Sequence, residues 1–68
     1  MELIVLERYP EIDYAIIYRK GATCNPFVAA WGLSPDMTWN QGHYFEHIYD
    51  CVEYVNQKQY EYWMNRKE

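Results

Sequence analysis

The fold is decided by residues 46–66, EHIYDCVEYVNQKQYEYWMNR, a stretch that contains neither Gly nor Pro. Mostly apolar side chains recur in it at steps of three and four residues, as on one side of an amphipathic helix. This stripe consists of Ile48, Cys51, Val52, Val55, Gln59 and Tyr62. A polar stripe is expected on the opposite side and consists of Glu46, Asp50, Glu53, Gln57 and Glu61. We therefore expect a helix over residues 47–66.

The chain before this helix has the composition of strands. Residues 2–9 and 14–19 are rich in aliphatic and aromatic side chains, and the turn at 10–13 between them predicts a hairpin. A loop follows at 20–26, and residues 27–33 predict a third strand. Small residues inside this third strand permit the close approach of a neighbouring element.

A turn at 34–37 separates the third strand from a short fourth strand, which we expect over 38–45 with a twist or bulge at Gly42. The order is β-β-β-β-α, which predicts an α+β fold. Three to four strands form an antiparallel sheet, and one long C-terminal helix packs on one face. The second face of the sheet has no obvious cover in the sequence. We expect one domain over residues 1–68.

Charge and cysteine content restrict the partners and the compartment. Ten acidic and six scattered basic residues give a net charge of −4, which disfavours direct binding to nucleic acid and favours a partner with a basic surface. The apolar run at 3–6 is too short to span a membrane, and no basic region with a long apolar segment marks a secretory signal. Cys24 and Cys51 are expected to be reduced thiols in the cytoplasm.

Two constellations could carry chemistry. His43, His47 and Cys51 have the four-residue spacing of a zinc site on one continuous helix. However, Gly42 and the aromatic pair that follows His43 place this histidine in a strand or at a junction. A Cys–His pair for nucleophilic catalysis lacks a third, orienting group. We therefore expect no metal, no cofactor and no enzymatic activity.

The helix carries the strongest indication of a binding surface. Residues 47–66 would form a helix about 30 Å long, whereas a six-residue strand spans only about 20 Å. Its last two turns are therefore expected to overhang the sheet and to present aromatic side chains. The acidic members of the polar stripe, Glu46, Asp50, Glu53 and Glu61, form either a solvated surface or a surface that attracts a basic partner. The predicted contact residues are Glu53, Tyr60, Glu61 and Trp63.

The remaining aromatic residues have two interpretations. Trp31 and Trp39 are expected to pack across the third and fourth strands. Tyr14, Tyr18 and Phe27 could form an aromatic sheet face, as in some single-strand RNA binders. That interpretation is weakened by the negative net charge.

Residues 27–55 carry a resemblance to a known group of domains. The pattern runs from Phe27 to Gly32, through a Pro-Asp turn, to Trp39 with Gln41-Gly42-His43-Tyr44-Phe45 and the helix at 48–55. It resembles small uncharacterised domains of phages and mobile elements of Gram-positive bacteria. The resemblance implies a phage or plasmid accessory protein, and many such proteins block a host defence protein such as a CRISPR effector. Residues 59–66 depart from the pattern.

These observations predict a non-catalytic protein-binding module that acts through an acidic and aromatic surface. The resemblance adds an anti-defence inhibitor in the cytoplasm of a host cell. The first alternative is a self-associating domain, in which a homodimer buries the aromatic excess. The second alternative is a binder of single-stranded nucleic acid that uses the aromatic sheet face.

Overall fold

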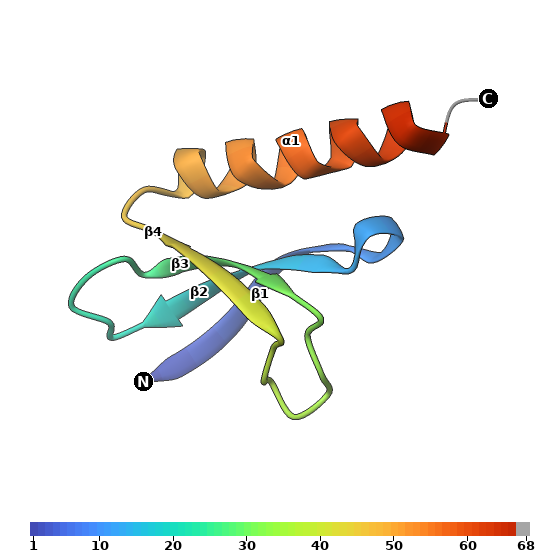
Figure 1. The fold of residues 1–68 in the computed structure, drawn as a ribbon. Coiled ribbons are helices and arrows are strands. Elements are labelled where there is room, and N and C mark those ends of the chain that lie inside the picture. Colours follow the sequence, from blue (N-terminus) through green and yellow to red (C-terminus); the bar gives the residue numbers. More distant parts are fainter. Residues whose placement is uncertain (67–68) are drawn as a thin grey trace.

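The computed structural model describes residues 1–66. One antiparallel sheet has the strand order β1-β2-β3-β4, and a helix lies across one of its faces (Figure 1). The elements are β1 (Glu2–Tyr9), the 3-10 turn η1 (Pro10–Ile12), β2 (Tyr14–Lys20), β3 (Phe27–Trp31), β4 (Gln41–Phe45) and α1 (Ile48–Arg66). The predicted α+β architecture, with one C-terminal helix packed on one face of the sheet, is confirmed.

The first two strands pair as the predicted hairpin, from Glu2 opposite Lys20 to Tyr9 opposite Tyr14. The turn between them is η1, which Pro10 begins, and Asp13 leaves it in the left-handed conformation at φ 60. The register shifts between Val5 and Glu7, so β1 contains a bulge at Leu6. A bulge adds one residue to one strand and increases its local twist.

The third and fourth strands are shorter than expected. β3 ends at Trp31, and β4 begins at Gln41. Gly32 has φ 75, and a Cβ at this position would clash with the side chain of Asn40. The backbone N–H of Asn40 in turn donates a hydrogen bond to the backbone carbonyl of Trp31 at 2.9 Å. The chain therefore leaves the sheet at Gly32 and returns at Asn40, which the sequence pattern at 27–45 does not reveal.

The helix-facing core is small and aliphatic. Ile16 and Ala29 from the sheet pack against Cys51 and Val55 from α1, and these four residues are buried. Ala29 has a side chain of one carbon, which lets the helix approach the sheet closely. The predicted apolar stripe is confirmed, because its other four members are half-buried. The five members of the polar stripe are exposed.

The second face of the sheet has a cover that the sequence analysis did not identify. Residues 32–40 fold back beneath the sheet (Figure 1). Leu33, Met37 and Trp39 from this loop pack against the cluster of Ile17, Val28 and Ala30. The expectation of an uncovered face is therefore wrong, because a loop without regular secondary structure supplies the apolar layer.

The expected pairing of the two tryptophans is also wrong. Trp39 packs on the loop-covered face, whereas Trp31 follows the buried Ala29 by two residues and therefore lies on the helix-facing side of β3. Trp31 retains 41% of its surface in contact with solvent. The residues opposite it in the neighbouring strands are Tyr14 and Gln41.

Candidate functional site

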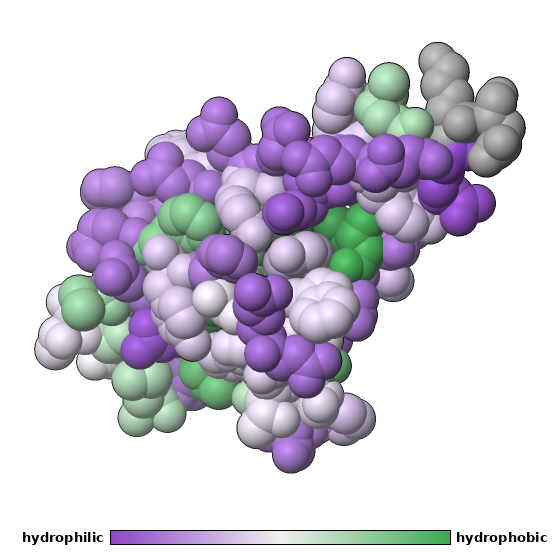
Figure 2. Space-filling model, viewed as in Figure 1, coloured by the Kyte–Doolittle hydropathy of each residue, from purple (hydrophilic) through white to green (hydrophobic). Residues whose placement is uncertain are grey.

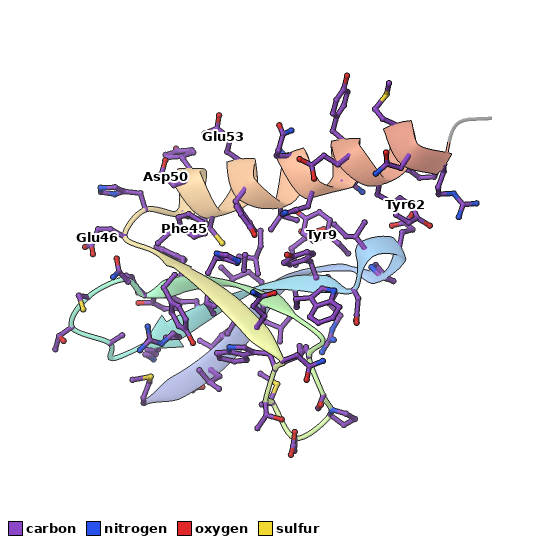
Figure 3. All side chains as sticks on the ribbon, in the orientation of Figure 1. Tyr9, Phe45, Glu46, Asp50, Glu53 and Tyr62 are labelled. Atoms are coloured by element: carbon purple, nitrogen blue, oxygen red, sulfur yellow. The ribbon has the colours of Figure 1, made fainter. Side chains whose placement is uncertain are left out.

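The side of α1 remote from the sheet carries the largest group of exposed apolar side chains on one element. We call this surface the outer face of α1 and define it by Tyr49, Glu53, Tyr60, Trp63 and Met64. The exposed fractions of its aromatic members are 82% for Tyr49, 61% for Tyr60 and 52% for Trp63, and Met64 is 47% exposed. Figure 3 shows Glu53 projecting away from the sheet and Tyr62 projecting toward it.

Helical geometry brings three of the four predicted contact residues together. Glu53 and Tyr60 are separated by seven residues, which is close to two full turns, so they lie in one row. Trp63 follows Tyr60 by three residues and lies beside it. All of these side chains are exposed in the structure.

Glu61, the fourth predicted residue, is exposed in the polar stripe of α1 but lies outside the row of Glu53 and Tyr60. It is rotated by about 100° from Tyr60 around the helix axis. Its carboxylate accepts a hydrogen bond from Nε2 of Gln57 at 3.3 Å. Burial and the interaction with Tyr54 raise the pKa of Tyr14 to about 12, and the charge of Glu61 adds to this rise. The charge of Glu61 therefore affects the pKa of Tyr14 in β2, although Glu61 itself is exposed to solvent.

Two exposed residues of the outer face were not among the predicted contacts, namely Tyr49 and Met64. A seven-residue step could have indicated the first, because Tyr49, Asn56 and Trp63 recur at that interval along α1. The hydrophilic band along α1 is interrupted by paler and apolar atoms toward the C-terminal part of the helix (Figure 2). The outer face thus combines one acid, Glu53, with four large apolar side chains.

The overhang of α1 is shorter than the length argument predicts. The turn η1 lies beneath the C-terminal half of the helix, and Ile12 packs against the helix-facing core. Tyr62 is half-buried on this side, and Arg66 donates from Nη1 to its hydroxyl at 3.2 Å. The same guanidinium lies 5.3 Å from the centre of the Tyr62 ring. Tyr60 and Trp63 remain exposed, although the ring of Trp63 meets the ring of Tyr62 with centres 5.5 Å apart.

One member of the polar stripe has a structural role. The carboxylate of Glu46 accepts a hydrogen bond from the backbone N–H of Asn25 at 3.0 Å. Arg19 donates from Nη1 to the carbonyl of Asn25 at 2.8 Å, and its guanidinium lies 5.0 Å from the ring centre of Tyr44. Glu46 lies at the junction of β4 and α1 in Figure 3. It therefore anchors the loop between β2 and β3 to this junction.

The three residues with zinc-site spacing lie in different elements. His43 belongs to β4 and packs against Tyr54 with tilted rings whose centres are 4.6 Å apart. His47 precedes α1, whereas Cys51 is fully buried within it. Burial raises the pKa of the Cys51 thiol to about 11, so the protonated thiol is favoured at neutral pH. Among residues 1–66, no three His, Cys, Asp or Glu side chains are arranged to hold a metal ion.

The aromatic sheet face lies on the side that α1 covers. Tyr18 and Phe27 stack with ring centres 5.4 Å apart, and Tyr14 meets Tyr54 of the helix at 6.1 Å. Tyr14, Tyr18 and Phe27 are all half-buried. A nucleic-acid strand stacked on these rings would have to share the face with α1.

The surface formed by the described part of the chain contains no pocket. No described helix is long and apolar enough to cross a membrane. The outer face of α1 combines exposed aromatic side chains with an acid on one helix. Comparisons of the chain with protein-family models, with curated proteins and with solved structures found no match.

Proposed function

We propose that this protein is a non-catalytic binding module that contacts a basic surface of another protein through the outer face of α1. One observation carries the proposal. Four of the large apolar side chains that remain exposed in the structure are Tyr49, Tyr60, Trp63 and Met64, and all four lie on this one helix. Exposed apolar patches of this kind mark interaction sites more often than scattered single residues do.

The charges around these side chains support a basic partner. Asp50, Glu53 and Glu61 are exposed on the same helix. The one lysine of the helix within the described residues, Lys58, is half-buried, with its amine 5.4 Å from the ring centre of Tyr54. Within the described residues, these three acids outnumber the one exposed cation of the helix, Arg66 at its C-terminal end. Complementary charge accelerates association, and aromatic anchors supply most of the affinity.

A comparative pull-down from a bacterial lysate tests the proposal. The bait proteins are the wild type, the double variant Tyr60→Ala/Trp63→Ala, and the control Tyr44→Ala. Tyr44 is a suitable control because it is 45% exposed but lies on β4, away from the outer face of α1. Proteins that bind the outer face should be recovered with the wild type and the control and lost with the double variant.

A second pair of variants tests the role of charge. Glu53→Lys and Glu11→Lys change the net charge equally, and both positions are exposed, on α1 and η1 respectively. With a purified partner, Glu53→Lys should slow association far more than Glu11→Lys does, and raising the salt concentration should reduce the difference. Equal recovery of all partners by the double alanine variant would show that the outer face of α1 is not the binding surface.

The narrower identity of the partner rests on the resemblance of residues 27–55 alone. A host defence protein, such as a CRISPR effector, remains the prediction that this resemblance supplies. Co-purification with such an effector, and inhibition of its activity in a purified assay, would test it. The outer face of α1 supports binding to a basic protein surface irrespective of this identity.

A further inference from the structure

We infer that β1 is a self-association edge, at which a second copy of this chain adds its own β1 in antiparallel orientation. The inference is independent of the proposed function, because β1 and the outer face of α1 are different surfaces. β1 is an outer strand of the sheet and pairs only with β2 within the described residues. An unpaired edge presents backbone donors and acceptors that can bind another strand.

The strand register shows which residues offer these groups. Arg19 donates to the carbonyl of Pro26, and Gly32 donates to the carbonyl of Asp13, so the odd-numbered residues of β2 direct their backbone groups toward β3. Backbone groups alternate along a strand, so the even-numbered residues of β2 face β1. Ile4 lies opposite Tyr18 and therefore faces β2. Its two neighbours, Leu3 and Val5, direct their N–H and C=O groups outward.

Leu3 and Val5 are separated by one residue, which makes the edge self-complementary. A two-fold axis at Ile4 places Leu3 of each copy opposite Val5 of the other. Each such pair exchanges two backbone hydrogen bonds, giving about four for the two pairs. The bulge limits the alternatives, since Glu7 lies opposite Ile16 and therefore directs its backbone groups toward β2. Centring the pairs on Val5 would thus leave Leu3 without a partner.

The side chains fit the same arrangement. Ile4 would meet Ile4 of the second copy, and Leu3 would meet Val5, so only aliphatic pairs lie near the axis. Leu3 and Val5 already pack against the buried cluster of Ile17, Val28 and Ala30, which the pairing would extend across the axis. Leu6, which is 43% exposed, would lie beside Glu2 of the second copy. No like charges face each other in this register.

The other edge of the sheet is less suited to the same contact. β4 runs from Gln41 to Phe45 and has Gly42 within it, so it offers fewer aliphatic side chains than the run at 3–6. Backbone groups alternate along β4 as well, so Gly42 and Tyr44 direct theirs away from β3. A contact between β1 of one copy and β4 of the next would not close and would produce chains longer than a dimer.

Sedimentation analysis of the whole protein from about 10 μM to about 1 mM tests the inference. The wild type should form a dimer as its concentration rises. Leu6→Glu would place one acid beside Glu2 of the opposite copy at each end of the contact and should weaken the dimer by about tenfold, whereas Leu6→Lys should retain it. Both changes remove the same apolar side chain from an exposed position, so circular dichroism should show an unchanged fold.

The double variant Glu2→Lys/Leu6→Glu should restore the dimer, because the lysine at position 2 then faces the glutamate at position 6 of the other copy. A wild type that stays monomeric over the whole range would overturn the inference. So would equal effects of Leu6→Glu and Leu6→Lys, or assemblies larger than a dimer. Loss of the dimer in Tyr60→Ala/Trp63→Ala would assign self-association to α1 instead. Failure of the pull-down described above would leave this result unaffected.

Discussion

The indole of Trp39 lies against the backbone of Gly42, so that a Cβ at position 42 would be 2.7 Å from Nε1 of the indole. The same Cβ would be 3.1 Å from Cγ2 of Val28. Trp39 reaches this position because residues 32–40 fold beneath the sheet. The absence of a side chain at Gly42 is therefore what allows the loop to cover the second face.

Replacement of Gly42 by Ala should destabilise the protein by about 1 to 3 kcal/mol, since the added methyl group must displace the indole or Val28. Urea denaturation measures the change. In a Trp39→Leu background, the cost of Gly42→Ala should be smaller, because the smaller side chain vacates the space above residue 42. An equal cost of Gly42→Ala in both backgrounds would show that contact with the indole does not cause the destabilisation.

Alkaline pH should reduce the stability through Cys51. Burial raises the pKa of its thiol from 9.0 to about 11, so the unfolded chain releases this proton first as the pH rises. The stabilising contribution is complete below pH 9 and is lost as the pH approaches 11, by at most about 2 to 3 kcal/mol. Burial also raises the pKa of Tyr14, from 10.0 to about 12, which extends the loss to higher pH.

Urea denaturation of the wild type and of Cys51→Ala at about pH 8 and about pH 10.5 measures this contribution. The wild type should lose more free energy of unfolding between the two values than Cys51→Ala does. Cys24→Ala is the matched control, because Cys24 is an exposed free thiol. Parallel losses in the wild type and Cys51→Ala would assign the alkaline effect to other groups.

Removal of the Glu46 carboxylate should loosen the loop between β2 and β3. In Glu46→Ala, the amide of Asn25 loses its acceptor and should exchange its hydrogen about five- to tenfold faster. Hydrogen exchange followed by NMR provides the measurement. Glu53→Ala is the control, because this exposed acid lies on α1 at a distance from the loop. Unchanged protection at Asn25 in Glu46→Ala would show that Arg19 alone holds the loop.

Stability and binding should separate on the two sides of α1. Tyr60→Ala and Trp63→Ala remove exposed side chains and should each change the free energy of unfolding by less than about 1 kcal/mol. Tyr62→Ala removes a half-buried ring that contacts Arg66 and should cost more. Thermal unfolding of the three variants, compared with their recovery of a partner, distinguishes the sides. Strong destabilisation by Tyr60→Ala would show that its ring supports the fold.

Local patterns predicted the regular elements of this fold well. The three- and four-residue steps from Ile48 to Tyr62 determine which side of α1 is buried, because they match the pitch of a helix. The hairpin of β1 and β2 follows from two aliphatic segments and a turn that begins with Pro10. These features depend on neighbours in the sequence, so the pattern contains the information.

Features that depend on distant contacts were not predictable in the same way. Trp39 is buried on the second face because Gly42 leaves room for it, and no periodicity in residues 32–40 expresses this relation. Glu46 continues the polar stripe of α1, yet its hydrogen-bond partner is Asn25 in a remote loop. For the candidate site, the pattern identified the exposed row of Glu53 and Tyr60 and the exposure of Glu61, whereas the contact of η1 with α1 depends on the path of the turn between β1 and β2.

The strand order has a consequence for the synthesis of this protein. Each strand pairs with the strand made immediately before it, so every strand that leaves the ribosome can pair at once with one that is already outside. Synthesis adds about 5 to 20 residues per second, whereas hairpins form within microseconds. Ile16 and Ala29 therefore remain exposed to solvent until Cys51 and Val55 have left the exit tunnel and can pack against them. The nascent chain is most exposed to chaperones and aggregation during that interval.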